Sequence, residues 1–313
     1  MKILVTGGLG FIGTNLIKEL ERRGHESWAC DLYNSHRDQY KRCDVREFRQ
    51  IEKLIDENRF DLVYHTAAEY GRWNGEEYYE NMWMTNVIGT KNILRLQERF
   101  GFRMVQFSSA EVYGDYDATM REDVMNEIPI KQMNDYAMSK WVNEMQVLNS
   151  ASMFRTETVR IRLFNVYGPG EHYTPYRGVV PAFIYNAAHE KPYTVYKGHK
   201  RTFEYVKDIC ATLGNLTDTF RPGEVYNLGS EEQYEIKYLS DLVLNLLDKD
   251  DRHVTYKDAE PFTTGVKRGD SSKAKRDLRH NCKTSLEQGV RETISWMRET
   301  YDSSEKPSLA IPQ

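Results

Sequence analysis

The first half of the chain alternates short apolar segments with amphipathic segments of helix length, and this alternation restricts the fold more than any other feature. Strands are expected at residues 2–8, 25–31, 60–68, 102–109 and 156–168, and helices between them at 13–24, 45–58, 78–101 and 135–154. Parallel strands need crossover connections of this length, whereas antiparallel strands can be joined by a tight turn. The sequence therefore predicts an α/β fold, a Rossmann-type doubly wound parallel sheet.

The alternation loosens after residue 167, where the stretch YGPGEHYTPYRG interrupts the pattern with proline and glycine. Beyond it we expect helices and short strands at 179–189, 193–198, 224–230, 238–247 and 286–301. We expect a nucleotide-binding domain over residues 1–167, to which some later segments return, and a smaller C-terminal substrate-binding lobe over 168–302. The polar, proline-containing residues 303–313 are predicted to form a flexible tail.

Composition excludes several classes of function. The net charge of −4, a pI near 6.1 and the lack of a basic run argue against nucleic acid or an anionic membrane as partner. No apolar run approaches the roughly 20 residues that span a bilayer, and we expect a cytoplasmic protein. The 4 cysteines lack CxxC spacing, so neither a metal site nor a redox motif is predicted.

The stretch VTGGLGFIG places Gly7, Gly10 and Gly13 between the first strand and the first helix. Glycines at this spacing let the main chain approach a pyrophosphate at the helix N-terminus. Asp31 ends the second strand, where a carboxylate accepts hydrogen bonds from ribose hydroxyls and repels a 2′-phosphate. Together these features predict an NAD site.

Four further residues near this turn bear on the cofactor. We expect Phe11 and Ile12, inside the turn, to lie against NAD. Asp44 follows the third apolar patch and is either a helix N-cap or an adenine contact. Arg37 lies near enough to Asp31 in the sequence to leave NADP as an alternative.

The stretch YAMSK sets Tyr136 and Lys140 four residues apart in a helical pattern, so their side chains share one face. A lysine ammonium beside a phenol stabilises the phenolate, which can take the hydroxyl proton of an alcohol while a hydride leaves to a nicotinamide. Ser109, at the end of a strand, is the natural third member and would donate a hydrogen bond to the reacting oxygen. In a chain with an NAD site this set predicts catalysis rather than a solvated helix face.

Five ordered motifs over about residues 1–300 resemble the extended short-chain dehydrogenase/reductase family, and more narrowly its NAD-dependent nucleotide-sugar epimerases and dehydratases. They are TGGLGFIG, FSSAEVYG, YAMSK, RLFNVYGPG and RTFEYVKD. The resemblance implies a Rossmann lobe with tightly held NAD that is regenerated in each turnover. It also implies a smaller lobe for a nucleotide diphosphate sugar, and often a homodimer built on two long helices.

The resemblance also assigns roles by position. It makes Tyr136 the base for the C4 hydroxyl and Lys140 its activator and a contact of the nicotinamide ribose. It places Ala67 under that ribose and Asn165 near the sugar diphosphate. It implies that Arg201 binds this diphosphate, and an arginine fork also suits paired phosphate oxygens on chemical grounds.

Glu111 lies two residues after Ser109, where family members that abstract a C5 proton carry a catalytic glutamate. The common dehydratases of deoxythymidine-diphospho-glucose carry an aspartate between these positions, whereas this chain has Ala110. A buried glutamate beside an apolar strand would have a raised pKa, which suits an acid/base group. The alternative is a strand-end carboxylate paired with a nearby lysine or arginine.

Two stretches would face the sugar. The first, AAEYGRWNGEEYY, departs from the family's usual sequence and contains Arg72; the second follows the proline-glycine turn and contains Tyr176 and Arg177. Tyr176 and Arg177 are candidates to cover the nucleotide or the sugar. Arg72 or Arg177 would serve as the cationic group for the sugar carboxylate in a decarboxylase.

The sequence therefore predicts an enzyme that oxidises C4 of a nucleotide diphosphate hexose to a transient 4-keto intermediate, with Glu111 as acid/base at C5 in a dehydratase-like reaction. The alternatives are a simple 4-epimerase, a uronic acid decarboxylase, a 4-keto-sugar reductase and a non-catalytic NAD-binding sensor. The intact set of Ser109, Tyr136 and Lys140 argues against the sensor, which needs no proton relay.

Overall fold

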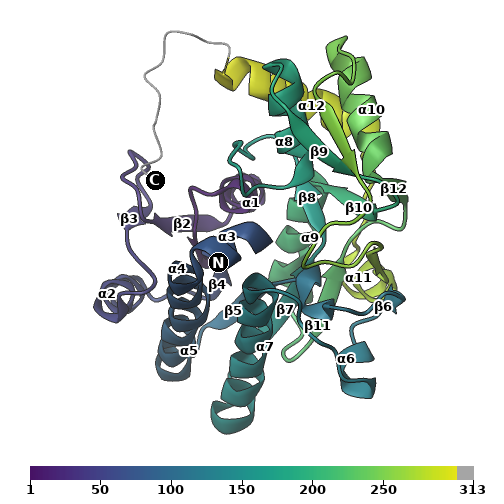
Figure 1. The fold of residues 1–313 in the computed structure, drawn as a ribbon. Helices are drawn as coiled ribbons and strands as arrows, with labels where there is room; N and C mark the ends of the chain where they lie inside the picture. Colours follow the sequence, from purple (N-terminus) through teal and green to yellow (C-terminus); the bar gives the residue numbers. More distant parts are fainter. Residues whose placement is uncertain (302–313) are drawn as a thin grey trace.

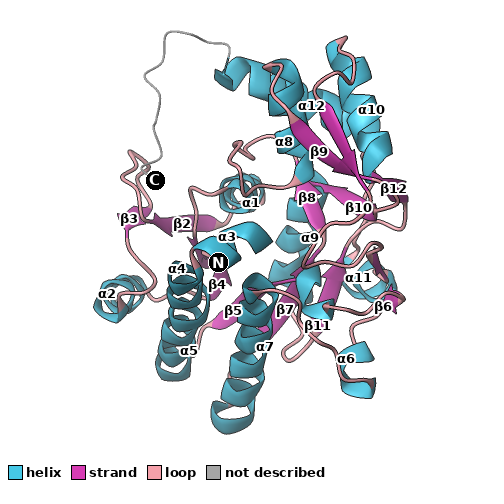
Figure 2. Ribbon diagram, in the orientation of Figure 1, coloured by secondary structure: helices cyan, strands magenta, loops and turns pink. Residues whose placement is uncertain are grey.

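A computed structural model of the chain describes residues 1–301, so the expected tail at 303–313 lies outside the described residues. A seven-stranded parallel sheet forms the centre of the larger lobe (Figures 1 and 2). In spatial order its strands are β11 (Val225–Leu228), β7 (Thr158–Leu163), β5 (Arg103–Ser109), β4 (Leu62–His65), β1 (Lys2–Thr6), β2 (Glu26–Asp31) and β3 (Tyr40–Arg42).

Helices cover both faces of this sheet because alternate residues of each buried strand point to opposite sides. Ile3 and Val5 of β1 face one core and Leu4 faces the other. The first core is covered by α1 (Phe11–Arg22) and α9 (Val206–Thr219), and the second by α2 (Phe48–Asn58) and α5 (Gly89–Phe100), beside which α7 (Asp135–Phe154) packs. The predicted doubly wound α/β fold is confirmed.

The strand order reverses beside β1. From there the chain first proceeds outward through β2 and β3, and then in the other direction through β4, β5, β7 and β11. In open α/β sheets a ligand crevice forms at such a reversal, outside the carboxyl ends of the strands. The predicted glycine turn follows β1 at this point.

Two segments differ from the sequence-based expectation. Residues 206–219, to which no element was assigned, form α9, whose threonines and Gly214 have low helix propensity. This helix packs on α1, and a side chain at Gly214 would collide with Arg23, because an added Cβ would lie 2.6 Å from its Nε. The expected long helix at 78–101 is divided into α4 (Tyr79–Trp83), a π-helical turn (Met84–Ile88) and α5.

The smaller lobe lies beside the carboxyl edge of the large sheet and has its own core (Figure 1). Its strands form two small sheets, one of β8 (Asn165–Tyr167), β10 (Lys200–Tyr205) and β12 (Gln233–Glu235), the other of β9 (Tyr193–Tyr196) and β13 (Val254–Lys257). Its helices are α8 (Val179–Ala188), α10 (Ile236–Leu247) and α12 (Leu286–Tyr301).

Shorter elements join the two lobes. They are α3 (Arg72–Glu77), a 3-10 turn (Ala110–Tyr113), β6 (Thr119–Met120), α6 (Val124–Glu127), β14 (Arg268–Gly269) and α11 (Ser272–Leu278). Strand β7 ends in the large sheet at Leu163 and β8 begins in the small sheet at Asn165. Since α9 and β11 lie on or in the large sheet, residues after 167 contribute to both lobes. The domain boundaries themselves stay a proposal.

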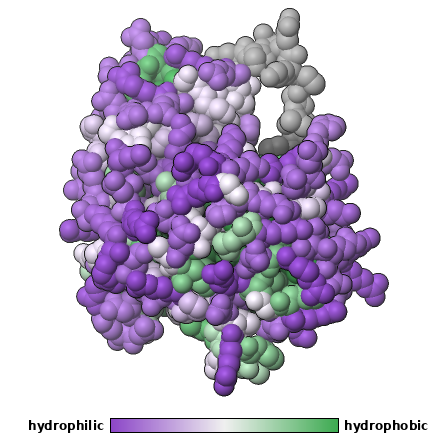
Figure 3. All heavy atoms as spheres, turned by 180° about the vertical axis from the view of Figure 1, so that it is seen from behind, coloured by the Kyte–Doolittle hydropathy of each residue, from purple (hydrophilic) through white to green (hydrophobic). Residues whose placement is uncertain are grey.

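The surface seen from behind is largely hydrophilic, with apolar atoms gathered in smaller areas (Figure 3). None of the helices within residues 1–301 combines the length and the apolar character that crossing a membrane requires.

Candidate active site

The turn after β1 is shaped by glycines that leave no room for side chains. Gly7 has a φ of +66°, and the amide of Gly10 donates to its carbonyl over 3.0 Å. A Cβ on Gly13 would lie 2.2 Å from that same carbonyl oxygen. Gly10 is the N-cap of α1, and no side chain caps the helix there. The first amide groups of α1 therefore form a site for an anionic group.

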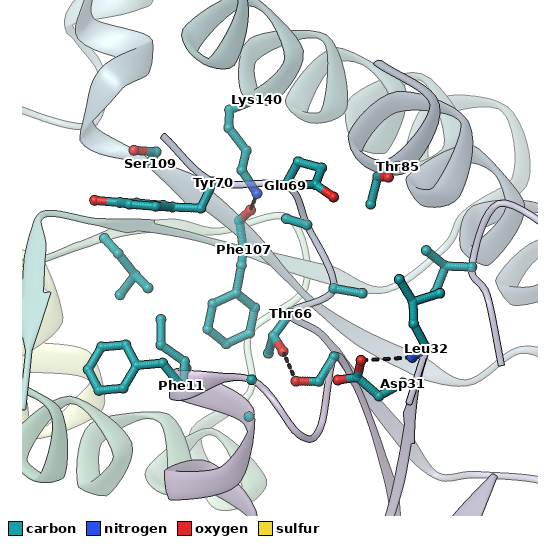
Figure 4. Close-up of a pocket in the computed structure, with 18 of the residues that line it drawn as sticks. Phe11, Asp31, Leu32, Thr66, Glu69, Tyr70, Thr85, Phe107, Ser109 and Lys140 are labelled. Carbon is teal, nitrogen blue, oxygen red and sulfur yellow. Dashed lines mark hydrogen bonds between the residues drawn. The ribbon is translucent and has the colours of Figure 1, made fainter. Parts of the chain in front are cut away.

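Asp31 lies beside this turn at the end of β2. Its carboxylate accepts hydrogen bonds from the amides of Leu9, at 3.0 Å, and Leu32, at 2.7 Å (Figure 4). Burial raises the pKa of Asp31, and the two amides oppose that rise. A carboxylate oxygen has lone pairs beyond those used by two amides, so Asp31 can also accept a hydroxyl.

A cavity of about 350 Å³ extends from Asp31 to the end of β5. All ten residues expected at the cofactor line it, namely Gly7, Gly10, Phe11, Ile12, Gly13, Asp31, Asp44, Ala67, Tyr136 and Lys140. The wall also contains Ser109, Glu69, Tyr70, Glu171 and Arg177. The cavity is therefore continuous from the glycine turn to the expected catalytic residues.

The sequence left the roles of two charged residues near the turn open, namely Asp44 and Arg37. Asp44 precedes Glu47, which is the N-cap of α2, and its carboxylate binds the guanidinium of Arg46 at 2.7 Å. It lines the cavity and is not the helix cap. Arg37 donates to Glu21 and to the Ser27 carbonyl, and it does not line the cavity.

Ser109, Tyr136 and Lys140 meet where β5 ends beside the first turns of α7. Asn134 begins this helix by accepting a hydrogen bond from the Ala137 amide at 2.8 Å. The Lys140 ammonium donates to the Phe107 carbonyl at 3.0 Å and lies 5.7 Å from the centre of the Tyr136 ring (Figure 4 labels Ser109, Phe107 and Lys140).

Burial governs the protonation of this pair. It raises the pKa of Tyr136 far above the ordinary value, although a hydrogen bond from Ser109 opposes the rise. It lowers the pKa of Lys140 to about 8. In the protein alone the phenol is therefore protonated at neutral pH, and Lys140 is close to its titration range.

A second, smaller cavity of about 50 Å³ adjoins the first and shares Tyr70, Ser109 and Tyr136 with it. Glu111, Arg72, Asn165 and Lys267 complete much of its wall. The Lys267 ammonium forms an ion pair and hydrogen bond with the Glu111 carboxylate. Arg72 forms a further ion pair with Glu260 at 2.8 Å.

Glu111 does not have the raised pKa that the sequence led us to expect. Burial alone would raise its pKa, but Lys267 and Arg72, and to a lesser extent Arg201, lower it to about 2. The expectation was wrong because it considered only the apolar strand before Glu111, whereas the cations come from other parts of the chain. Glu111 is therefore an ionised member of a charged cluster.

The other expected sugar-facing residues lie in different places. Asn165 donates from its side chain to the Thr202 carbonyl at 2.9 Å, and Arg201 is only 6% exposed. The Arg201 guanidinium donates to main-chain carbonyls that include Thr264, at 2.8 Å, and Gly265, at 2.7 Å. Arg177 lines the larger cavity, whereas Tyr176 donates to Glu77 at 2.5 Å and lines neither.

Sequence reasoning missed two wall residues, Lys267 and Glu171. Lys267 lies 156 residues from its partner Glu111 and is in no motif that predicts an active site. Glu171 directly follows the turn YGPG, and nothing in the sequence indicates that this turn lies beside α1 in the cavity wall. Within residues 1–301 no three His, Cys, Asp or Glu side chains gather where they could hold a metal ion.

Comparison with known proteins gives a consistent result. The family model described as "NAD dependent epimerase/dehydratase family" matches residues 3–229. The chain is 30% identical to UDP-N-acetyl-alpha-D-glucosaminuronate decarboxylase of Bacillus cytotoxicus, over 95% of this chain and 98% of that protein. It is 27% identical to dTDP-glucose 4,6-dehydratase of Mycobacterium tuberculosis, over 96% and 94% of the respective chains.

Solved structures share the same fold over nearly the whole chain. Pal from Bacillus thuringiensis has a TM-score of 0.85 and 29% identity, over 96% of this chain and 100% of that one. The UDP-glucose 4-epimerase of Thermotoga maritima, solved with UDP-glucose, has a TM-score of 0.87 and 25% identity, over 96% and 99% of the respective chains.

Proposed function

This chain belongs to the NAD-dependent epimerase/dehydratase family and is an NAD-dependent nucleotide-sugar enzyme, and from this premise we propose its substrate and the roles of its residues. The substrate is a nucleoside diphosphate hexuronate, whose C4 is oxidised in the larger cavity. Tyr136 takes the C4 hydroxyl proton, Ser109 donates a hydrogen bond to the C4 oxygen, and Lys140 stabilises the phenolate. NAD held along the cavity wall that contains Gly7, Gly13 and Asp31 would supply the hydride acceptor for this oxidation.

The observation that supports a hexuronate is the charge of the smaller cavity and its surroundings. Lys267, Arg72 and Arg201 carry three positive charges, and Glu111 and Glu260 carry two negative charges. One positive charge is thus left for a ligand. Buried charges are costly without a partner, so an uncharged C6 hydroxymethyl group is a poor fit here and a C6 carboxylate is a good one.

A C4 ketone makes a hexuronate a β-keto acid, and this decides the chemistry that follows. The bond between C5 and C6 breaks, carbon dioxide leaves, and the electron pair moves onto the C4 oxygen as an enolate. A proton from solvent then adds at C5, and Tyr136 returns its proton to the C4 oxygen as C4 is reduced again, with the hydride that the cofactor would supply. We place the Glu111–Lys267 pair beside C5 and C6, where it holds the carboxylate before this bond breaks.

Two other outcomes use the same first step. Return of the hydride to the opposite face of C4 without loss of carbon dioxide is 4-epimerisation. Dehydration of an uncharged hexose, with Glu111 as acid/base at C5, is the reaction expected from the sequence. It needs a proton donor for the leaving C6 hydroxyl, and the low pKa of Glu111 does not favour that role.

Product analysis in D2O distinguishes these reactions. We expect UDP-glucuronate to lose carbon dioxide and gain one deuterium at C5, as read by mass spectrometry, while UDP-glucose stays unchanged. An isomer without deuterium would instead establish 4-epimerisation. Loss of water from UDP-glucose would contradict the hexuronate proposal and support dehydration.

Lys267→Arg tests the cationic subsite directly. Burial lowers the pKa of Lys267 to about 8 despite Glu111, so the wild-type ammonium loses its charge above this pH and KM for UDP-glucuronate should rise. A guanidinium stays charged, so KM of the variant should remain flat up to pH 9. Lys273→Met is the matched control, because Lys273 binds Glu224 away from both cavities. If KM rises with pH as much in Lys267→Arg as in the wild type, Lys267 does not bind the sugar carboxylate.

We further propose that the protein is a homodimer. Exposed apolar side chains project from the π-helical turn before α5 and from α7, two helices that lie side by side (Figure 1). They include Met84, Ile88, Met145 and Leu148. Exposed apolar residues gathered in this way favour association with a second copy. The cytoplasmic location stays a prediction.

A further inference from the structure

Glu171 lies in the wall of the larger cavity, and the catalytic scheme above gives it no role. It follows Gly170, which packs against Phe11 and Asn15 of α1, and its side chain is buried, with 3% of the residue exposed. One carboxyl oxygen, Oε2, is buried without a hydrogen-bond partner among residues 1–301. A buried polar atom in this state costs about 1–3 kcal/mol.

The surroundings of Glu171 connect it to the reacting phenol through Tyr70. Its other oxygen, Oε1, and the Tyr70 hydroxyl both border Gly178, at 3.6 and 3.8 Å from the position of an added Cβ. The Tyr70 ring in turn packs edge-on against the Tyr136 ring, with 5.6 Å between centroids. The Arg177 guanidinium lies 5.5 Å from the centre of the Tyr70 ring. Glu171 thus belongs to a group of cavity-lining residues that reaches Tyr136 through Tyr70.

We propose that the Glu171 carboxyl group binds a hydrogen-bond donor of the glycosyl ring, a hydroxyl or an amide N–H, and so helps to select the sugar. This inference rests on the proposed function, since it deepens the description of the same site. Buried polar atoms in proteins are usually paired. Among residues 1–301 the glutamates Glu171 and Glu204 each have an unpaired buried Oε2, but only Glu171 lines a cavity, so the ligand of the cavity is the natural partner for its Oε2. Burial also raises the pKa of Glu171 to about 7, against the effects of Arg177 and the Gly178 amide, so a ligand donor would relieve an unfavourable state.

The sugar fits this position better than the cofactor does. The diphosphate of NAD binds at the glycine turn and is anionic, so it would repel an ionised carboxylate beside it. A sugar hydroxyl or acetamido N–H carries no charge and donates a hydrogen bond. The cofactor's carboxamide is also a donor, and the experiment below separates it from the sugar.

A matched control exists in the smaller lobe. Glu204 on β10 is also fully buried, and burial raises its pKa to about 7 as well, but it lines neither cavity. A change at Glu204 therefore reproduces the loss of a buried glutamate without touching the ligand. Its effects on folding and its lack of effect on sugar choice form the baseline for Glu171.

The test compares sugars that differ by one hydroxyl. Binding and kcat/KM are measured on the holoenzyme for UDP-glucuronate and UDP-glucose and for their 2-deoxy and 3-deoxy analogues. We expect one deoxy analogue to bind the wild type about 10-fold or more weakly than its parent, which is the value of one hydrogen bond to a charged group. In Glu171→Met this discrimination should disappear, whereas Glu204→Gln should retain it. Glu171→Gln, which keeps an acceptor oxygen, should retain part of it.

The remaining outcomes each overturn a different statement. Unchanged discrimination in Glu171→Met would remove the proposed role of Glu171 and leave the function of the enzyme standing. A lower NAD content of the purified Glu171 variants, with sugar discrimination intact, would assign the residue to the cofactor. A wild-type protein that binds none of these sugars would overturn the proposed function and this inference with it.

Discussion

Asp31 occupies the position that decides which dinucleotide the larger cavity accepts. Two main-chain amides hold its carboxylate at the cavity wall, so the group cannot turn away from a ligand. A 2′-phosphate would meet this negative charge, whereas a ribose hydroxyl can donate to it. The nearby Arg37 is bound to Glu21 and does not offset the repulsion.

Asp31→Asn should therefore weaken NAD binding without creating a tight NADP site. Hydrogen bonds to a charged group contribute about 1.5–3 kcal/mol, so we expect a loss of about 10-fold to 100-fold in NAD affinity. The measurement is the cofactor content of the purified protein, together with titration of the apoprotein by NAD and NADP. Asp38→Asn, an exposed change in the same loop, is the control. Equal NAD affinity in wild type and Asp31→Asn would exclude the assigned contact.

Glu111 shows why a residue's chemistry depends on more than its own strand. The same carboxylate would have a raised pKa among apolar neighbours, yet beside Lys267 and Arg72 its pKa falls to about 2. In this setting it holds the position and charge of Lys267 rather than carrying a proton. We therefore expect the choice of reaction to depend on the pair of Glu111 and Lys267 and not on the glutamate alone.

At the scale of elements, β5 and α7 bring the catalytic residues together. Arg162 on the neighbouring β7 binds the Glu144 carboxylate of α7 at 2.9 Å, and the Ser108 hydroxyl of β5 donates to it at 2.6 Å. Glu144 lies one helical turn after Lys140. This buried network fixes the helix against the strand, so Lys140 and Ser109 are held at a constant separation.

Strand β10 carries Glu204, a buried carboxyl group whose surroundings differ from those of Glu144. Glu204 has no ion pair among the described residues, and Oε1 accepts the Ser230 amide at 2.8 Å; hydrogen bonds from Thr202 and Asn165 also oppose the effect of burial on its pKa. Burial raises its pKa from 4.5 to about 7. Between pH 4.5 and about pH 7, Glu204 is thus protonated in the folded protein and ionised in the unfolded chain. This residue therefore makes stability fall as the pH rises from about 4.5 through 7.

Glu204→Gln should remove this dependence. The wild type should lose about 2–3 kcal/mol more of its unfolding free energy than the variant between pH 5 and pH 8. Urea unfolding of both proteins at the two pH values measures the difference. The comparison between pH values cancels any pH-independent cost of packing the amide. Parallel losses in the two proteins would show that Glu204 does not titrate in this range.

At the scale of the whole molecule, the smaller cavity is closed by segments from distant parts of the chain. Arg72 and Glu260 are separated by 188 residues, and Lys267 lies 156 residues from Glu111. These ion pairs connect the first residue of α3 and the 3-10 turn after β5 to the segment that precedes β14. The proposed sugar subsite thus forms only when both lobes are folded against each other.

The proposed dimer is also a property of the whole molecule. Leu148 on α7 is 41% exposed and Met84 before α5 is 46% exposed. Leu148→Glu should shift the protein to a monomer, because a charge at the centre of an apolar contact remains unpaired there. Light scattering during gel filtration measures the mass. Tyr238→Glu, at an exposed position on α10, should leave the mass unchanged, and a monomeric wild type would refute the dimer.

Local patterns in the sequence were sufficient to predict the geometry of the glycine turn and of the proposed catalytic set. Gly7, Gly10 and Gly13 lie within one turn, and Tyr136 and Lys140 within one turn of one helix, so spacing alone determines their geometry. The parallel pairing of the strands followed from the alternation, since helix-length crossovers require it. These features need no knowledge of distant residues.

The residues that surround the proposed sugar subsite, and their charges, became visible only in the tertiary structure. Lys267 and Glu171 carry no local signal, and α9 forms despite its threonines because it packs on α1. The charge of Glu111 depends on cations that the chain brings from far away, and electrostatic energy depends on distance in space, not on separation along the chain. The sequence by itself therefore determined the fold and the family, while the tertiary structure decided which charged groups line the smaller cavity, where we propose that the sugar binds.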